Sequence, residues 1–203
     1  MKQLIFIHGW NRFPNNEALC KELEKRDYKP FEEKKRRSNR LAEELKLEYQ
    51  FFKPEMPNKF NASYMVWKLR FEKVLAYLNN DNLVLIWHSL WWQFLLKYIW
   101  ENWFPKKIKQ LHLVSTVIDA SDRAPEKQYQ GDFEFDLNII PNLEKHAEQI
   151  FIYHSTDDAT VPYSHAKKIK SYLPSAKLIT LTDRWHLYNK ETFPEILENI
   201  LKS

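Results

Sequence analysis

Short apolar runs alternate along the chain with longer segments in which apolar residues recur every three or four positions. The short runs predict strands near 3–8, 48–53, 83–88, 109–115, 149–154 and 177–181. The longer segments predict helices near 15–26, 32–46, 63–79, 90–102, 137–147, 163–172 and 192–202. Because strands that alternate with helices form βαβ units, we expect an α/β three-layer sandwich with a six-stranded parallel sheet. The expected strand order is 2-1-3-4-5-6, with a site at the carboxyl edge near the first and third strands.

The length and composition favour one folded domain spanning residues 1–203. The chain is 44% hydrophobic and 15% aromatic, which excludes a disordered protein. The apolar run after Met1 breaks at His8 and lacks a cleavage site, and no stretch reaches the ~18 apolar residues of a membrane span. With Cys20 as the lone cysteine, no internal disulfide can form. We therefore expect a cytoplasmic protein.

The formal net charge of +4 is small for this length. The densest basic segment, 34–40, lies on a predicted helix in which Glu32 and Glu33 stand four residues before Arg36 and Arg37. Such pairs stabilise a solvated helix face, so the segment is not read as a nucleic-acid patch. We expect neither a nucleic-acid nor a membrane partner, and the sequence does not identify a protein partner.

The composition departs from the average in one respect. The chain has 2 glycines and 8 tryptophans, whereas ~7% glycine would give about 14. Residues 84–92 read V-L-I-W-H-S-L-W-W, which has the form of a strand entering the turn G-x-S-x-G with tryptophan in place of each glycine. Side chains at 87 and 91 would fill the space where the helix after this turn meets the strand.

The same replacement recurs at other turns that favour glycine. It is found in L-I-F-I-H-G-W at 4–10, in E-N-W-F-P at 101–105 and in D-R-W-H-L at 183–187. We interpret this as an open reading frame from a genetic code in which UGA means glycine, translated as if UGA meant tryptophan. The hypothesis assigns glycine to Trp10, Trp87, Trp91, Trp92, Trp103 and Trp185. Trp67 fits a genuine tryptophan on an amphipathic helix, Trp100 is unassigned, and the alternative is a divergent, inactive protein with aromatic replacements.

Three residues that follow predicted strands supply the groups for acyl transfer by serine. Ser89 follows the strand at 83–88, Asp158 follows the strand at 149–154, and His186 follows the strand at 177–181. Their chain order is that of the nucleophile, acid and base of a nucleophile-elbow enzyme. The competing carboxylate is Asp157, but the spacing D-x-x-V-P favours Asp158, which leaves Asp157 as a turn or cap residue. Without these partners, Ser89 would be read as a helix N-cap.

Backbone N–H groups of Leu90 and Trp10 are the expected oxyanion donors. His88 and His154 end strands beside the predicted site and are read as structural, while His8 is placed beside the oxyanion loop. The remaining histidines, His112, His146 and His165, show no metal-ligand spacing. No metal or other cofactor is expected.

Six segments together resemble the small single-domain serine hydrolases of the retinoblastoma-binding-protein-nine type, within the α/β-hydrolase fold. They are F-I-H-G-W at 6–10, F-F-K-P-E-M-P-N at 51–58, Y-M-V-W-K at 64–68, W-H-S-L-W-W at 87–92, S-T-D-D-A-T-V-P at 155–162 and R-W-H-L at 184–187. As printed, the chain departs from that family at the motif glycines, including Ser155. The resemblance does not cover residues 28–48, which form an additional helical segment.

The resemblance implies a catalytic triad of Ser89, Asp158 and His186 that hydrolyses a small ester, thioester or amide. The partner is then a small-molecule acyl substrate. The polar segment 119–136 follows a strand end and is either a lid over the site or a passive connector. The alternative function is a non-catalytic interaction protein that retains the fold.

Overall fold

The computed structural model describes residues 1–9, 13–25, 37–79, 82–89, 92–102, 104–119, 131–187 and 192–202. Its centre is one six-stranded sheet in the order β2-β1-β3-β4-β5-β6, in which every neighbouring pair is parallel. The strands are β1 (Lys2–Ile7), β2 (Tyr49–Phe52), β3 (Leu83–His88), β4 (Ile108–Val114), β5 (Ala147–Ser155) and β6 (Lys177–Leu181). The predicted sheet and strand order are confirmed.

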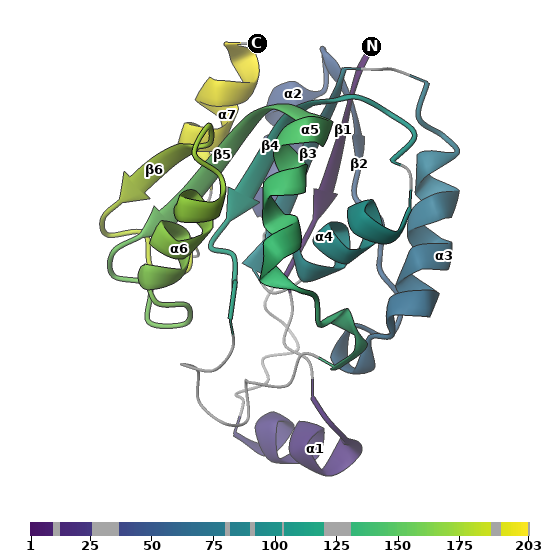
Figure 1. Ribbon diagram of the computed structural model, residues 1–203, viewed down its shortest axis with the longest axis vertical. Coiled ribbons are helices and arrows are strands. Elements are labelled where there is room, and N and C mark those ends of the chain that lie inside the picture. The colour runs from purple at the N-terminus through teal and green to yellow at the C-terminus, as the bar shows by residue number, and fades with distance from the viewer. Residues whose placement is uncertain are drawn as a thin grey trace.

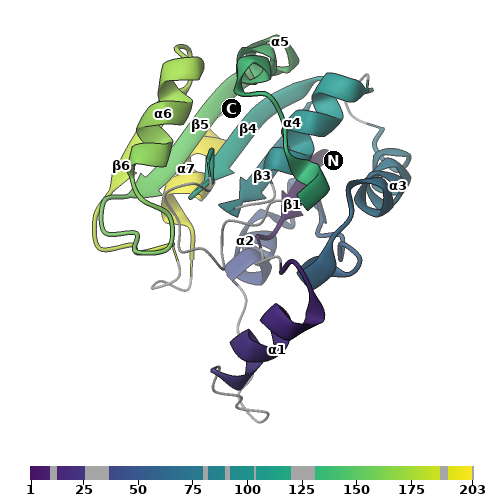
Figure 2. The same ribbon diagram turned by 60° about the horizontal axis from the view of Figure 1, so that its bottom comes forward.

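Helices cover both faces of this sheet (Figure 1). They are α1 (Asn16–Glu24), α2 (Arg37–Leu45), α3 (Tyr64–Leu75), α4 (Trp92–Glu101), α5 (Leu143–His146), α6 (Ser164–Tyr172) and α7 (Pro194–Leu201). One face carries α3, α4, α5 and α6, and the other carries α2 and α7. Helix α1 lies beyond the carboxyl edge of the sheet and has no buried residue (Figures 1 and 2).

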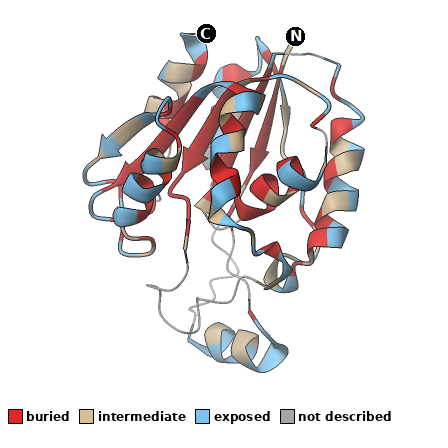
Figure 3. Ribbon diagram, viewed as in Figure 1, coloured by how far each residue is buried: buried red, intermediate tan, exposed pale blue. Residues whose placement is uncertain are grey.

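Successive side chains of a strand point to opposite faces of the sheet, so the protein has an apolar core on each face. In β1, Ile5 and Ile7 point into the core under α3 and α4, whereas Leu4 and Phe6 point into the core under α2 and α7. The central strand β3 is buried along its whole length, and β1 and β4 are buried at all but one position each (Figure 3). This is the pattern expected of a parallel sheet with helices on both sides.

Two predicted elements differ from the structure. The segment 137–147 is not one α-helix, because Leu137–Asn142 is a 3₁₀ helix that contains Pro141, and only Leu143–His146 is α-helical. Proline has no N–H to donate into a continuing α-helix. Ala147 already begins β5, two residues before the expected start.

The described tryptophans fall into two groups. Trp67, Trp87 and Trp92 are fully buried, whereas Trp100 and Trp185 are 61% and 60% exposed. Trp10, Trp91 and Trp103 lie outside the described residues.

None of the described helices is long and apolar enough to cross a membrane.

Candidate active site

Ser89 directly follows β3 and has a φ of 63°. A left-handed conformation is strained for serine and lifts its side chain out of the line of the strand. Gly9, just after β1, lies against this turn. A Cβ at Gly9 would be 2.4 Å from the Ser89 Cβ and 2.6 Å from the His88 carbonyl oxygen. Only glycine leaves room for the end of β1 to pack against Ser89.

Asp158 is fixed by backbone donors from its own loop. Its Oδ1 accepts hydrogen bonds from the N–H of Thr160 at 2.8 Å and of Val161 at 2.9 Å. The loop follows β5, the neighbour of β4, so the carboxylate is held at the same edge of the sheet as Ser89. Its second oxygen, Oδ2, remains available for a side-chain partner.

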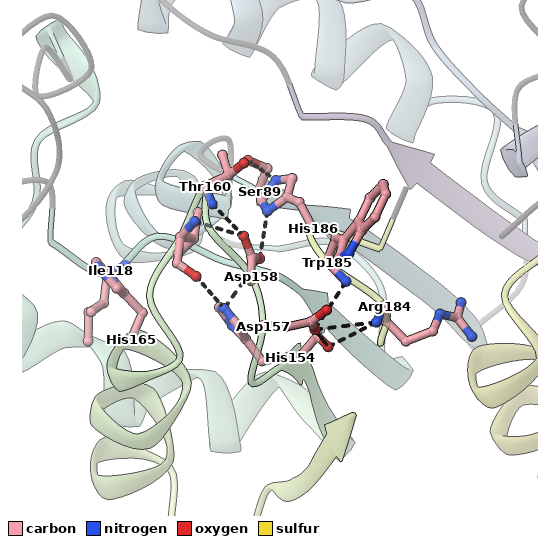
Figure 4. A network of polar contacts seen from close by, with 12 residues as sticks. Ser89, Ile118, His154, Asp157, Asp158, Thr160, His165, Arg184, Trp185 and His186 are labelled. Carbon is pink, nitrogen blue, oxygen red and sulfur yellow. Dashed lines mark hydrogen bonds and ion pairs between the residues drawn. The ribbon is translucent and has the colours of Figure 1, made fainter. Parts of the chain in front are cut away.

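That partner is His186, which joins all three residues of the predicted triad (Figure 4). Its Nδ1 is 2.7 Å from Asp158 Oδ2, and its Nε2 is 3.1 Å from Ser89 Oγ. The structure therefore brings Ser89, Asp158 and His186 together in one hydrogen-bonded chain. Asp157 does not contact the imidazole but binds the backbone of Arg184 and Trp185.

The surroundings of Asp158 keep its carboxylate ionised. Burial raises the pKa of Asp158, but the hydrogen bond and charge of His186, with the N–H of Val161, outweigh burial and hold that pKa below its usual range. A carboxylate in this state stabilises the imidazolium that forms when His186 takes a proton. The arrangement therefore permits general-base activation of the Ser89 hydroxyl.

His154 lies on the other side of Asp158. Its Nε2 is 2.8 Å from the Val161 carbonyl oxygen and 3.5 Å from Asp158 Oδ2. Burial lowers the pKa of His154, and the Val161 carbonyl and the charge of Asp158 oppose this only in part. A neutral His154 donates its Nε2 proton to Val161 and so fixes the loop that carries Asp158.

The His88 ring lies between the rings of His186 and His8 in a series of ring contacts. The His88 ring centroid is 5.1 Å from that of His186 and 5.2 Å from that of His8.

Among the described residues, no three His, Cys, Asp or Glu side chains are grouped so that they could hold a metal ion.

The predicted oxyanion donors, Leu90 and Trp10, lie outside the described residues, as do residues 120–130 of the expected lid. Their roles stay predictions.

Two sets of contacts beside the site were not expected from the sequence. Arg184 belongs to the motif R-W-H-L with no role expected of it, yet its side chain is buried and ion-paired with Glu195. The hydrogen bonds of Asp157 to the backbone at 184 and 185 span 27 and 28 positions. Contacts to backbone so distant in the chain leave no sequence signature.

Fold and strand order define an α/β-hydrolase fold, and solved structures similar to this chain have it too. The ydeN gene product of B. subtilis is 19% identical, with a TM-score of 0.72 over 100% of this chain and 98% of that chain. A meta-cleavage product hydrolase from Pseudomonas fluorescens IP01 is 11% identical, with a TM-score of 0.71 over 100% of this chain and 90% of that chain. A serine hydrolase from Cycloclasticus zankles is 12% identical, with a TM-score of 0.64 over 100% of this chain and 88% of that chain.

At these identities the likeness is one of fold. No protein-family model matches the chain, and no curated protein sequence is significantly similar to it.

Proposed function

We propose that the protein is a serine hydrolase that cleaves a small ester, thioester or amide through an acyl-enzyme on Ser89. The observation that carries this proposal is the hydrogen-bonded chain from Ser89 Oγ through His186 to Asp158. A serine in a left-handed turn after a buried strand, with an imidazole and a carboxylate in line, is the arrangement that activates a hydroxyl for attack.

In this mechanism His186 Nε2 takes the Ser89 proton while Oγ attacks the acyl carbon. The tetrahedral intermediate collapses when His186 returns that proton to the leaving oxygen, sulfur or nitrogen. Water then attacks the acyl-enzyme, His186 takes the water proton, and the acid is released as Ser89 regains its hydrogen. Throughout, Asp158 holds the ring by Nδ1.

The similar structures agree with this chemistry. Their printed names include a meta-cleavage product hydrolase and a serine hydrolase. The six motif segments add a more specific likeness to the retinoblastoma-binding-protein-nine type, and we propose that the chain belongs to this subgroup. A location in the cytoplasm and a single domain over 1–203 belong to the same proposal.

An organophosphonate probe and a chromogenic short-chain ester test the proposed function. We expect the probe to label one serine, and Ser89→Ala to abolish both labelling and turnover, because no neighbouring group can replace the nucleophile. Retained turnover in Ser89→Ala would exclude the serine mechanism. Absence of labelling and turnover in a folded chain would favour a non-catalytic interaction protein.

We further propose that six tryptophans stand where the natural protein has glycine, through translation of UGA as tryptophan. Two of the three described positions support this, whereas at the third the buried Nε1 of Trp92 donates to the Val117 carbonyl. Trp185 has a φ of 49°, a conformation that glycine adopts without strain, and its side chain is largely exposed. Trp87 packs on Phe71 and Phe94, but its buried Nε1 has no hydrogen-bond partner among the described residues.

Trp67 shows the contrast. Its Nε1 donates a 2.8 Å hydrogen bond to the Pro57 carbonyl, and its ring contacts Phe94 and Phe133. A buried indole usually finds such a partner. Reading the codons tests the proposal: UGA at positions 10, 87, 91, 92, 103 and 185, with UGG at 67, is expected, and UGG at the six positions would overturn it.

A further inference from the structure

The two adjacent aspartates after β5 bind different parts of the segment that carries His186 (Figure 4). Asp158 binds the imidazole itself. Asp157 instead accepts hydrogen bonds from the backbone N–H of Arg184 at 3.3 Å and of Trp185 at 3.2 Å. The Ser155 hydroxyl also donates to the same Asp157 oxygen, Oδ1.

The segment that Asp157 binds is a strained turn. Asp183, Trp185 and Leu187 have φ values of 54°, 49° and 56°, so left-handed residues alternate on either side of His186. For residues other than glycine this conformation is costly and persists only where surrounding contacts impose it. The carboxylate of Asp157 supplies such contacts immediately before His186.

The side chain of Arg184 fixes the turn from the opposite side. It is 1% exposed, forms an ion pair with Glu195 on α7, and donates from Nη2 to the Thr192 carbonyl at 3.2 Å. The turn is therefore held between the loop after β5 and the helix α7. Only the backbone of this turn reaches Asp157, so the contact at position 185 is the same with tryptophan or glycine.

We propose that Asp157 is a positioning residue, which holds the turn at 184–185 so that His186 can reach both Ser89 and Asp158. The inference rests on the proposed hydrolase function, and Asp157 itself does not touch the reacting atoms. The hydrogen bond from Ser155, followed by those from the backbone, holds the pKa of Asp157 below its usual range. The carboxylate therefore keeps its charge near neutral pH.

Three variants test this role by ester turnover. Asp157→Ala removes the acceptor, and we expect kcat to fall about 10- to 100-fold with little change in KM, because the base is displaced while substrate binding is not. Asp157→Asn keeps Oδ1 as an acceptor and is expected to restore most of kcat. Asp183→Asn removes a carboxylate from the same turn without removing these contacts and serves as the charge control, with unchanged kcat.

Amide hydrogen exchange supplies a readout independent of activity. The N–H of residue 185 should lose protection in Asp157→Ala and keep it in Asp157→Asn, whereas the N–H of Arg184 also donates to the Ser155 hydroxyl at 3.2 Å and is expected to change less. Wild-type kcat together with wild-type protection in Asp157→Ala would overturn the proposal. A fall in kcat that is equal in Asp157→Asn and Asp183→Asn would overturn it too, since charge alone would then explain the loss.

The Ser89→Ala variant separates this proposal from the proposed function. Turnover that survives in Ser89→Ala means that the serine mechanism has failed. If turnover depends on Ser89 but not on Asp157, only the positioning role has failed.

Discussion

Gly9 and Ser89 follow different strands, yet they lie so close together that a side chain at position 9 would clash with Ser89. From the sequence, the His-Gly pair after the first strand was expected to form a turn. The structure adds a second constraint, because the missing Cβ of Gly9 leaves the space that Ser89 and the His88 carbonyl occupy. This contact joins segments 80 positions apart and has no local pattern, so periodicity could not reveal it.

We therefore expect Gly9→Ala to displace the turn that carries Ser89. The added methyl group must move backbone as well as side-chain atoms, which costs about 1–3 kcal/mol of stability. A shift of the nucleophile by a fraction of an ångström or more should lower kcat about 10-fold or further. Ester turnover and thermal unfolding measured together check this, and a wild-type kcat in the variant would contradict it.

His112 lies at the centre of the sheet, where it stacks on Phe151 with ring centroids 5.0 Å apart. Its Nδ1 is 2.9 Å from the Tyr153 hydroxyl, and burial lowers its pKa from 6.5 to about 3. Between these two values the unfolded chain binds a proton that the folded chain does not. The folded state therefore loses stability as the pH falls below 6.5, whereas above 6.5 this residue contributes no pH dependence.

The expected slope from His112 is about 1.4 kcal/mol per pH unit well below 6.5. Urea unfolding at several pH values between 7.5 and 4.5 measures it. His112→Gln keeps a polar side chain but cannot be protonated, so its free energy of unfolding should fall less steeply. Parallel slopes in the two proteins would contradict the contribution assigned to His112.

At the scale of elements, strands were easier to predict than helices. The run at 83–88 matches β3 because a parallel strand buried on both faces is a continuous apolar segment, and the run at 177–181 matches β6 although this edge strand has no buried position. The face of α3 was harder to identify. Its buried residues are Tyr64, Trp67, Phe71 and Leu75. Three of these four are aromatic, and exposed Met65 and Leu69 confuse the periodicity.

In the candidate site, too, some features could be predicted from the sequence and others could not. Ser89, Asp158 and His186 could be predicted because each follows a strand, and the sheet order brings strand ends together. The contacts of Asp157 and Arg184 could not, since they depend on how one turn packs against another loop and against α7. Burial of an arginine also runs against the usual exposure of that residue type.

At the scale of the whole molecule, the glycine proposal predicts a large change in behaviour. A chain with glycine at 10, 87, 91, 92, 103 and 185 should be more stable, more soluble and more active than the printed chain. Overpacking costs about 1–3 kcal/mol per site, so several sites together approach the ~5–15 kcal/mol stability of a typical domain. Denaturant unfolding and ester turnover of the two chains check this.

A matched pair of single variants sharpens that comparison. Trp67→Gly should cost at least about 3–5 kcal/mol, as expected for loss of a well-packed indole. Trp87→Gly should instead leave stability unchanged or raise it. An equal loss in both variants would mean that the indole of Trp87 is a native part of the core.

The adjacency of Asp157 and Asp158 sets the permitted length of the connection between β5 and α6. One carboxylate faces the imidazole and its neighbour faces the main chain that carries it, so the two cannot exchange places by small adjustments. Inserting one residue before them would bring Asp157 to the position that faces His186, and deleting one would bring Ala159 there. Designers who graft this connection onto another scaffold should therefore copy its residue count before they copy its side chains.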